Sequence, residues 1–183
     1  MRIIAGIARG RRLGPVPPGT RPVSDRAREG LFSSLGPEIE GAYVLDLYAG
    51  TGALGLEARS RGAASATFVD RDRSATAAIR DNLARTRLEP AAVVTAEVER
   101  FLFRTGDPAA AADLIFLDPP YDLEGPGLDR VLARLGSSAP PSEGRTVVLT
   151  RGNRSSTHVI PIDWALARRL TYGDSLVFLY REV

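Results

Sequence analysis

The most informative stretch of the sequence for the fold is Val44-Leu45-Asp46-Leu47-Tyr48-Ala49-Gly50-Thr51-Gly52-Ala53-Leu54-Gly55. An apolar run leads here into a Gly-x-Gly turn, and a segment with helical spacing of its apolar residues follows at residues 53–60. A strand, a glycine turn and a helix in this order are typical of a parallel α/β sheet, whose ligands bind beyond the carboxyl ends of the strands. Glycines let the backbone turn sharply there, and the start of the helix offers unpaired N–H groups. The stretch therefore predicts a small-molecule site at residues 46–55.

Short apolar runs alternate with amphipathic stretches from residue 42 onward. This is the pattern of a parallel sheet with helices on both faces. We expect strands at residues 42–48, 66–70, 92–95, 114–118 and 146–150, and helices at residues 53–60, 73–85, 98–103 and 128–135. The last two strands, residues 164–170 and 175–180, flank Tyr172-Gly173-Asp174 and are expected to pair antiparallel. The prediction is thus an α/β fold with a Rossmann-like doubly wound sheet, mostly parallel, that ends in a C-terminal antiparallel hairpin.

The first 34 residues are strongly basic, with seven arginines and two acidic residues, whereas the rest of the chain is mildly acidic. Residues 2–7 and 11–13 are expected to form a short β-hairpin that turns at Arg9-Gly10, and the proline-rich residues 14–22 a stiff linker. This asymmetry is typical of an arm that contacts phosphates, with Arg9, Arg11 and Arg12 as the first candidates. Two plainer explanations stay open: a merely solvated surface, and a genomic bias, because all 24 cationic side chains are arginine.

Bulk properties exclude several classes of protein. A chain of 183 residues, 44% of them hydrophobic, suits one domain with one substantial core. There is no cysteine and a single histidine, His158, so disulfides, thiolate nucleophiles and a metal site are not expected. The N-terminus lacks the apolar core of a signal peptide, and no run approaches the ~18 apolar residues needed to cross a bilayer. We therefore expect a cytoplasmic protein without membrane contact.

Two acidic residues at strand ends narrow the choice of ligand. Asp46 lies inside the first strand, four residues before Gly50, where it would receive the ammonium of a zwitterionic ligand and repel a pyrophosphate. Asp70 ends the next apolar run, and a carboxylate there accepts the two ribose hydroxyls of either NAD or S-adenosylmethionine. The glycine turn alone fits NAD as well, so Asp46 is the residue that favours S-adenosylmethionine.

The tetrad Asp118-Pro119-Pro120-Tyr121 directly follows a buried-type strand. Two consecutive prolines fix the backbone and remove two N–H donors, so the local carbonyls are stiffly aimed and accept hydrogen bonds from a ligand. We expect the Asp118 carboxylate and the Pro119 carbonyl to hold the two hydrogens of an exocyclic base amine. Tyr121 would stack on a base taken out of its helix. Alternatively, the prolines only end the strand and Tyr121 packs in the core.

Together, the glycine loop and the tetrad resemble class I S-adenosylmethionine-dependent methyltransferases that act on amino groups of nucleic acids. More narrowly, three segments resemble the RsmD family: Met1-Arg2-Ile3-Ile4-Ala5-Gly6, Arg21-Pro22-Val23-Ser24-Asp25-Arg26-Ala27-Arg28-Glu29-Gly30-Leu31-Phe32, and Tyr172-Gly173-Asp174. The resemblance covers nearly the whole chain. It implies a basic N-terminal hairpin and linker, residues 1–23, and a methyltransferase domain, residues 24–183.

The resemblance also implies roles for individual residues. The implied cofactor-binding residues are Ser24, Asp25, Asp46, Tyr48, Gly50, Thr51, Gly52, Asp70, Arg71, Glu97 and Val98. Ser24 and Asp25 would line the methionine end of the cofactor, and Asp46, Gly50 and Gly52 would hold its amino acid part. Asp70 would bind the ribose, and Arg71 and Glu97 the adenine. The implied catalytic residues are Asp118, Pro119, Pro120 and Tyr121. Asp70 departs from the family, whose members often carry glutamate there, and its shorter side chain makes the ribose contact less assured.

By the same resemblance, the activity is transfer of a methyl group from S-adenosylmethionine to the N2 amine of a guanine in 16S ribosomal RNA. The substrate would be the small ribosomal subunit or its assembly intermediate, and the enzyme a monomer. We expect Asp118 to orient the amine rather than act as a base, since an exposed aspartate is a weak base near neutral pH. Two alternatives stay open: a DNA adenine-N6 or cytosine-N4 methyltransferase, which the lack of a separate DNA-recognition stretch disfavours, and a non-catalytic Rossmann-like RNA-binding protein.

Overall fold

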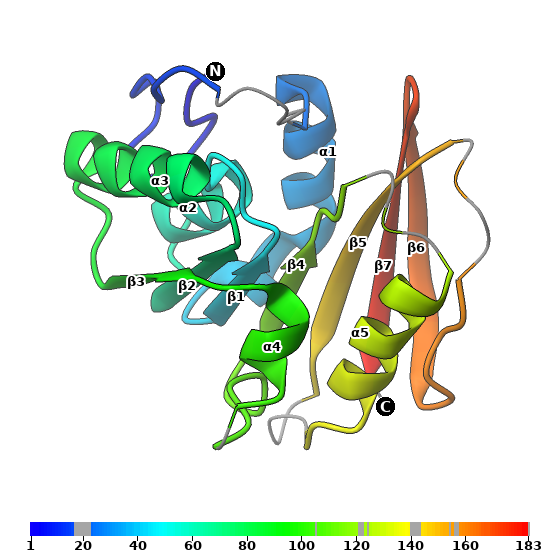
Figure 1. Cartoon of the computed structure of the whole chain (residues 1–183). Coiled ribbons are helices and arrows are strands. Elements are labelled where there is room, and N and C mark those ends of the chain that lie inside the picture. Colours follow the sequence, from blue (N-terminus) through cyan, green and yellow to red (C-terminus); the bar gives the residue numbers. More distant parts are fainter. Residues whose placement is uncertain are drawn as a thin grey trace.

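A sheet of seven strands forms the centre of the computed structural model, as far as its described residues go (Figure 1). The described residues are 1–16, 23–104, 106–120, 123, 125–139, 144–153, 155 and 158–182. The strand order is β3-β2-β1-β4-β5-β7-β6; β7 is antiparallel to both of its neighbours, and the other pairs are parallel. The strands are β1 (Tyr43–Leu47), β2 (Ser65–Asp70), β3 (Ala91–Thr95), β4 (Leu114–Leu117), β5 (Thr146–Gly152), β6 (Trp164–Tyr172) and β7 (Ser175–Glu182).

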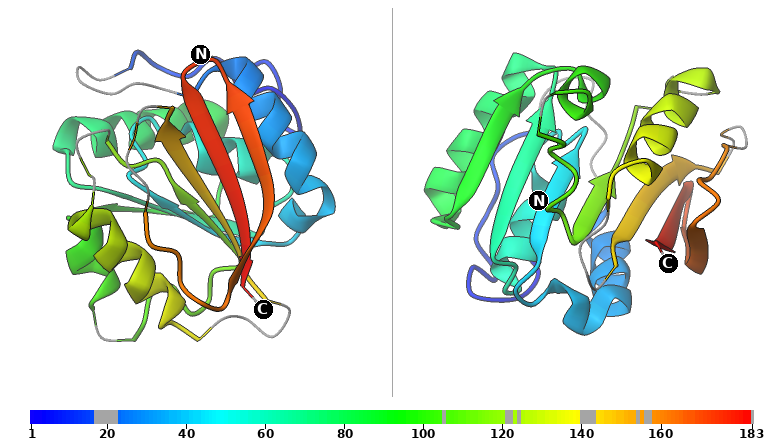
Figure 2. Two further views of the ribbon diagram at one scale, coloured as in Figure 1. Left: turned by 90° about the vertical axis from the view of Figure 1, so that its right-hand side faces the viewer. Right: turned by 90° about the horizontal axis from the view of Figure 1, so that it is seen from below.

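Helices cover both faces of this sheet. They are α1 (Asp25–Leu35), the 3-10 helix η1 (Gly36–Ile39), α2 (Ala53–Ser60), α3 (Arg73–Thr86), α4 (Val98–Leu102) and α5 (Pro126–Gly136). The buried side chains of α1, α2 and α3 join one core cluster and those of α4 and α5 the other. Figure 2 shows α4 and α5 on the opposite side of the sheet from α1. Within the described part of the chain, no helix is long and apolar enough to cross a membrane.

The central strand β4 shows how the two cores are separated. Its four residues are all buried, and side chains alternate between the faces of a strand. Phe116 packs in the core under α1, where its ring lies 5.7 Å from that of Phe32. Ile115 and Leu117 pack in the core under α5. Because side chains of β4 pack in both cores, the backbone at Asp118, the residue that follows β4, is held in place.

The predicted fold class is confirmed: the sheet is mostly parallel and ends in an antiparallel hairpin. The pattern did not reveal that β7 lies between β5 and β6, which only long-range pairing decides. Some boundaries also differ. β1 ends at Leu47 rather than at Tyr48, because Tyr48 has a φ of 59° and so cannot continue a strand. Helix α5 begins at Pro126, two residues before its expected start, since proline is well tolerated in the first helical turn.

The N-terminal segment, residues 1–16, folds back on itself through one antiparallel bridge between Arg2 and Arg12. The expected extended piece at residues 2–7 is wrong in its second half, because residues 5–10 form bends and turns. Gly6 permits the close approach to α2: a Cβ there would lie 1.7 Å from the Ser60 carbonyl oxygen. The side chains of Ile3, Ala8 and Leu13 belong to the core that α1 and α2 share. Most of the expected linker, residues 17–22, lies outside the described residues.

Candidate active site

Acidic residues gather at the carboxyl ends of the parallel strands. Asp46 is the fourth residue of β1 and Asp70 the last of β2; Glu97 follows β3 and Asp118 follows β4. The register aligns Leu47 with both Val69 and Leu117, so these acids lie along one edge of the sheet. This is the edge at which α/β sheets bind their ligands.

The loop after β1 is folded into a cradle at this edge. Tyr48, Gly50 and Gly52 all have positive φ angles, of 59°, 55° and 74°. The Gly50 N–H donates to Asp70 Oδ2 at 2.8 Å, and the Asp72 N–H donates to Asp70 Oδ1 at 2.9 Å. The carboxylate of Asp70 is therefore fixed against the loop. Non-glycine residues rarely adopt positive φ, so the strained backbone at Tyr48 fits a loop shaped for a ligand.

Asp46 lies beneath this loop and is only 1% exposed. Its Oδ2 accepts a hydrogen bond from the Gly55 N–H at 2.9 Å. Burial raises the pKa of Asp46 well above its usual range, against the Gly55 hydrogen bond, and the charges of Asp118 and Asp70 raise it further. A carboxylate among other acids in a buried place is stabilised by a bound cation. The positively charged ammonium and sulfonium groups of S-adenosylmethionine fit this group of carboxylates, whereas the negatively charged pyrophosphate of NAD does not.

The predicted adenine contacts lie at the ends of β2 and β3. Arg71 and Glu97 are both exposed and form an ion pair of 3.6 Å. The Tyr48 phenol is partly buried, and burial together with the charges of Glu99 and Glu97 raises its pKa. Val98 is different, because its side chain is 2% exposed and packs in the core under α4. Its side chain therefore serves packing, and Tyr48, Arg71 and Glu97 remain the candidates for an adenine contact.

Thr51 and Ser24 support the backbone around the site. Thr51 is buried, and its carbonyl accepts a hydrogen bond from the Asn82 side chain at 3.0 Å, which ties the glycine loop to α3. Ser24 caps α1: its Oγ accepts from the Ala27 N–H at 3.2 Å. Serine is a favoured residue at this position for that reason. Both hydroxyl residues thus shape the site through the main chain.

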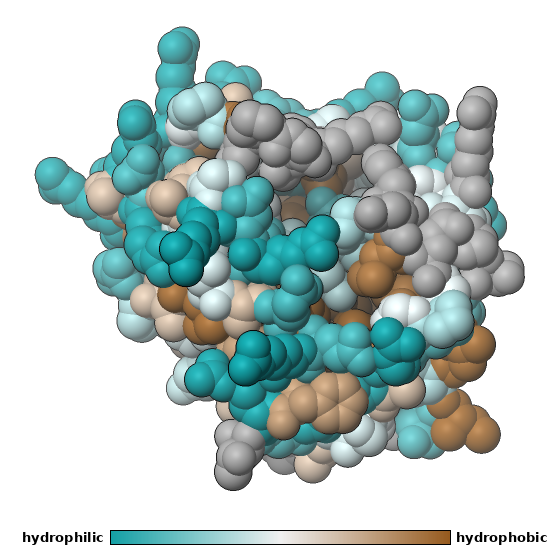
Figure 3. Space-filling view, viewed as in Figure 1, coloured by the Kyte–Doolittle hydropathy of each residue, from teal (hydrophilic) through white to brown (hydrophobic). Residues whose placement is uncertain are grey.

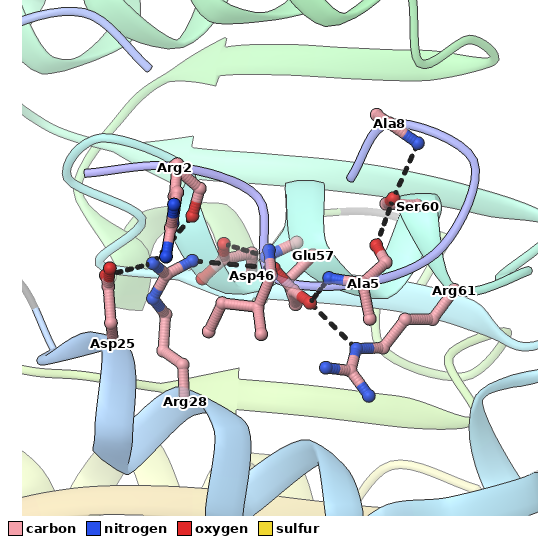
Figure 4. A network of polar contacts seen from close by, with 11 residues as sticks. Arg2, Ala5, Ala8, Asp25, Arg28, Asp46, Glu57, Ser60 and Arg61 are labelled. Atoms are coloured by element: carbon pink, nitrogen blue, oxygen red, sulfur yellow. Dashed lines mark hydrogen bonds and ion pairs between the residues drawn. The ribbon is translucent and has the colours of Figure 1, made fainter. Parts of the chain in front are cut away.

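Asp25 at the start of α1 is held by a buried arginine (Figure 4). Arg28 Nη2 lies 2.6 Å from Asp25 Oδ1 and donates to the Arg2 carbonyl at 2.9 Å. Its Nη1 lies 3.6 Å from Glu57 Oε2, and both Arg28 and Glu57 are fully buried. Arg28 is one of the seven arginines that make the first 34 residues basic, but its side chain is buried and so adds nothing to a basic surface. Arg28 joins the start of α1 to α2 and to the first residues of the chain.

Glu57 of α2 binds the backbone of the N-terminal segment. Its two carboxylate oxygens accept hydrogen bonds from the N–H groups of Ile4, at 2.8 Å, and Ala5, at 3.0 Å. Ser60 Oγ accepts from the Ala8 N–H and donates to the Ala5 carbonyl. The segment is therefore held against the body of the protein through its backbone.

The three arginines predicted to contact RNA are all exposed, but they are not equivalent. Arg11 Nη1 donates to the carbonyls of Thr86, at 2.7 Å, and Arg85, at 3.3 Å, and so satisfies the last turn of α3. Arg9 and Arg12 lie on the same segment. Figure 3 shows a largely hydrophilic surface over the region of α3 and the N-terminal segment. Arg9 and Arg12 therefore fit a phosphate contact better than Arg11 does.

Asp118 stands at the end of β4, where its N–H donates to the Leu47 carbonyl at 3.4 Å. It is partly buried, and burial raises the pKa of Asp118 to about 7, although the positive charge of Arg151 lowers it. The expectation of an exposed, weakly basic aspartate is therefore wrong. A carboxylate that titrates near neutral pH is suited to accept a proton.

The rest of the tetrad differs in exposure. Pro119 is buried, and Pro120 is exposed with a carbonyl that accepts from the Leu123 N–H at 3.0 Å. Tyr121, the predicted base-stacking residue, lies outside the described residues. Sequence reasoning assigned no role at this edge to Arg151, a buried cation at the end of β5. Its only sequence signal is a charged residue that directly follows an apolar strand.

The strand order, the glycine loop and the acids at the carboxyl edge define a class I S-adenosylmethionine-dependent methyltransferase. Comparison with known proteins agrees. A family model described as "Conserved hypothetical protein 95" matches residues 1–181. Ribosomal RNA small subunit methyltransferase D of Escherichia coli K12 is 37% identical, over all of this chain and 90% of that protein. The protein of the same name from Haemophilus influenzae is 40% identical, over all of this chain and 94% of its own length.

Among solved structures, Escherichia coli yhhF, described as a candidate methyltransferase, superposes with a TM-score of 0.86 at 37% identity. The match covers all of this chain and 97% of that one. The chain belongs to the RsmD family of methyltransferases, as its sequence motifs indicated.

Proposed function

We propose that this enzyme transfers the methyl group of S-adenosylmethionine to the N2 amine of a guanine in 16S ribosomal RNA, within the small subunit or its assembly intermediate. The names of its relatives, which are ribosomal RNA small subunit methyltransferases, support the substrate class. The observation that carries the proposal is the position of Asp118-Pro119 at the end of β4, beside the glycine loop that follows β1.

S-adenosylmethionine supplies an electrophilic methyl group on a sulfonium. On the protein side, Asp46 receives its ammonium, and Asp70 its ribose hydroxyls. The Asp118 carboxylate and the Pro119 carbonyl accept the two N2 hydrogens of guanine, and so aim the nitrogen lone pair at the methyl group. The lone pair forms the new N–C bond while the C–S bond breaks and its electrons stay on sulfur.

After transfer, the amine carries an extra proton, which must leave. Asp118, with a pKa of about 7, is placed to accept it. No covalent enzyme intermediate is required, and the chain contains no cysteine to form one. Catalysis then rests on positioning and on acceptance of the amine hydrogens.

The test is methyl transfer from labelled S-adenosylmethionine to small ribosomal subunits from a strain that lacks its native enzyme, followed by nucleoside analysis. We expect labelled N2-methylguanosine with the wild-type protein and a loss of about 10²-fold to 10⁴-fold in kcat with Asp118→Ala. Asp81→Ala, which removes an exposed carboxylate on α3, is the matched control and should keep full activity. Label confined to DNA adenine or cytosine would replace the proposal with a DNA methyltransferase. Binding of S-adenosylmethionine without transfer to any nucleic acid would leave a non-catalytic RNA-binding protein.

A further inference from the structure

Arg151 is a buried cation beside the reacting end of the sheet. It is the sixth residue of β5 and only 3% exposed. β5 pairs with β4 so that Leu149 lies opposite Leu117, and Arg151 is two residues further along. It therefore lies level with the first residues of the chain beyond β4. Burying a guanidinium costs free energy unless its surroundings compensate, so a buried arginine here calls for a reason.

The first reason is a contact with the turn after β4, whose described residues are Asp118, Pro119, Pro120 and Leu123. Arg151 Nη1 donates to the Leu123 carbonyl at 3.1 Å. The Leu123 N–H in turn donates to the Pro120 carbonyl at 3.0 Å. Two prolines deprive this turn of N–H donors that would otherwise tie it to the sheet. The Arg151 guanidinium on β5 provides a hydrogen-bond donor that these prolines lack.

The second reason is electrostatic. Among the described residues, Arg151 of β5 is the charged group that acts on the Asp118 carboxylate, whose own charge in turn raises the pKa of Asp46 on β1. Burial disfavours the negative charge of Asp118 and raises its pKa. Arg151 acts in the opposite direction and lowers the pKa of Asp118. An ionised Asp118 is the form that accepts amine hydrogens, so the charge on β5 favours the reactive form.

We propose that Arg151 is a positioning residue for methyl transfer: it holds the turn after β4 against β5 and keeps a positive charge behind the Asp118 carboxylate. The inference rests on the proposed function, because it assigns Asp118 and Pro119 to the target amine. Arg151 acts through these residues and need not touch the substrate.

The experiment compares Arg151→Met, which removes the charge and the donors, with Arg151→Lys, which keeps the charge but loses the fork of donors. We expect Arg151→Met to lower kcat by about 10-fold to 100-fold, because a misplaced catalytic group costs this much. The KM for S-adenosylmethionine should stay within about 2-fold, since the cofactor contacts lie on β1 and β2. The acidic limb of the pH–rate profile should move up by about one unit, because an opposite charge near a carboxylate shifts its pKa by this order. Arg151→Lys should leave the limb in place and lower kcat less.

Arg134→Met is the matched control, because Arg134 Nε donates to the Leu102 carbonyl at 3.1 Å on the same side of the sheet but on α5. It should change neither kcat nor the pH limb. If Arg151→Met proves too unstable, the pKa of Asp118 followed by carbon-13 NMR in Arg151→Gln, which loses the charge but keeps a donor, still tests the charge, with Asp118→Asn for assignment: the pKa should be higher than in wild type, and an equal value would overturn the inference. A kcat loss in Arg151→Met without a shifted limb, or an equal loss in Arg134→Met, would overturn the inference. Absence of methyl transfer by the wild-type enzyme would instead contradict the proposed function.

Discussion

The two ends of the sheet carry buried charge in different ways. At the amino end of β5, Arg145 is 2% exposed, and its guanidinium donates to four carbonyls, those of Ala109, Ala112, Leu135 and Ala139. It also pairs with Glu182 at 3.2 Å. Burial still lowers the pKa of Arg145 and raises that of Glu182. The charges at this end are nevertheless compensated within the chain.

At the carboxyl end, burial raises the pKa of both Asp46 and Asp118, and like charges add to the effect at Asp46. One cation, Arg151, partly offsets this at Asp118. An arrangement of acids that repel one another costs stability, and it is retained where a ligand supplies the missing positive charge. One end of the sheet therefore holds the fold together, and the other suits a ligand that carries positive charge.

The largest expected effect comes from the amino end. Arg145→Met removes a donor from four carbonyls, of which those of Ala109 and Leu135 keep a backbone N–H partner, and leaves the carboxylate of Glu182 without its cation. We therefore expect the free energy of unfolding to fall by about 3–5 kcal/mol, as for other broken buried ion pairs. Urea unfolding followed by circular dichroism measures this. Arg100→Met, at an exposed position on α4, is the control and should change the free energy of unfolding by less than about 0.5 kcal/mol.

Arg145→Met should retain the wild-type kcat at temperatures well below its melting temperature, because Arg145 lies at the end of the sheet away from the site. A marked loss of kcat in the folded variant would contradict the separation of the two ends.

The next effect concerns Asp46→Asn, which removes the charge but keeps an oxygen to accept from the Gly55 N–H. We expect the affinity for S-adenosylmethionine to fall by about 10-fold to 100-fold, the usual value of a hydrogen bond to a charged group. Isothermal titration calorimetry measures it. Unchanged affinity would show that Asp46 does not receive the ammonium.

The same substitution, Asp46→Asn, should stabilise the protein without cofactor, to a degree that depends on pH. The folded-state pKa of Asp46 is raised above its unfolded value of about 3.9, so its contribution to stability is fully present below about pH 4 and is lost as pH rises through the raised value. Without cofactor, Asp46→Asn should therefore melt at a higher temperature than wild type at pH 7, and the gap should close toward pH 4. A gap that does not depend on pH would rule out burial of the charge as its cause.

The sequence predicted the parts of the site that are local in the chain. Strand, glycine turn and helix follow one another at residues 43–60, and the acids at strand ends were visible as charged residues after apolar runs. Asp118-Pro119-Pro120 was recognisable for the same reason. Each of these signals needs only neighbours in sequence, and the parallel sheet then brings them to one edge.

The parts that were missed depend on contacts between distant residues. Arg28 looked like one more basic surface residue, but its partner Glu57 lies 29 positions away and in another helix. The pKa of Asp118 depends on its burial and on the charge of Arg151, which lies 33 positions further along the chain, so the sequence around Asp118 suggested an exposed aspartate. The role of Arg11 at the end of α3 rests on carbonyls more than 70 residues away. Such pairings follow from the packing of helices and have no local pattern.

The smallest effect separates the arginines of the N-terminal segment. We expect Arg9→Ala with Arg12→Ala to weaken binding to 16S ribosomal RNA and to flatten its salt dependence by about 0.7–0.9 logarithmic units for each phosphate that the protein no longer neutralises. Arg11→Ala should flatten it less, because the Arg11 guanidinium is engaged at the end of α3, and should instead lower the melting temperature. Filter binding across a salt series, with thermal unfolding in parallel, distinguishes the two. If the Arg9 and Arg12 changes leave affinity and slope as in wild type, the segment is a structural strap of the folded body, and RNA is held by another surface.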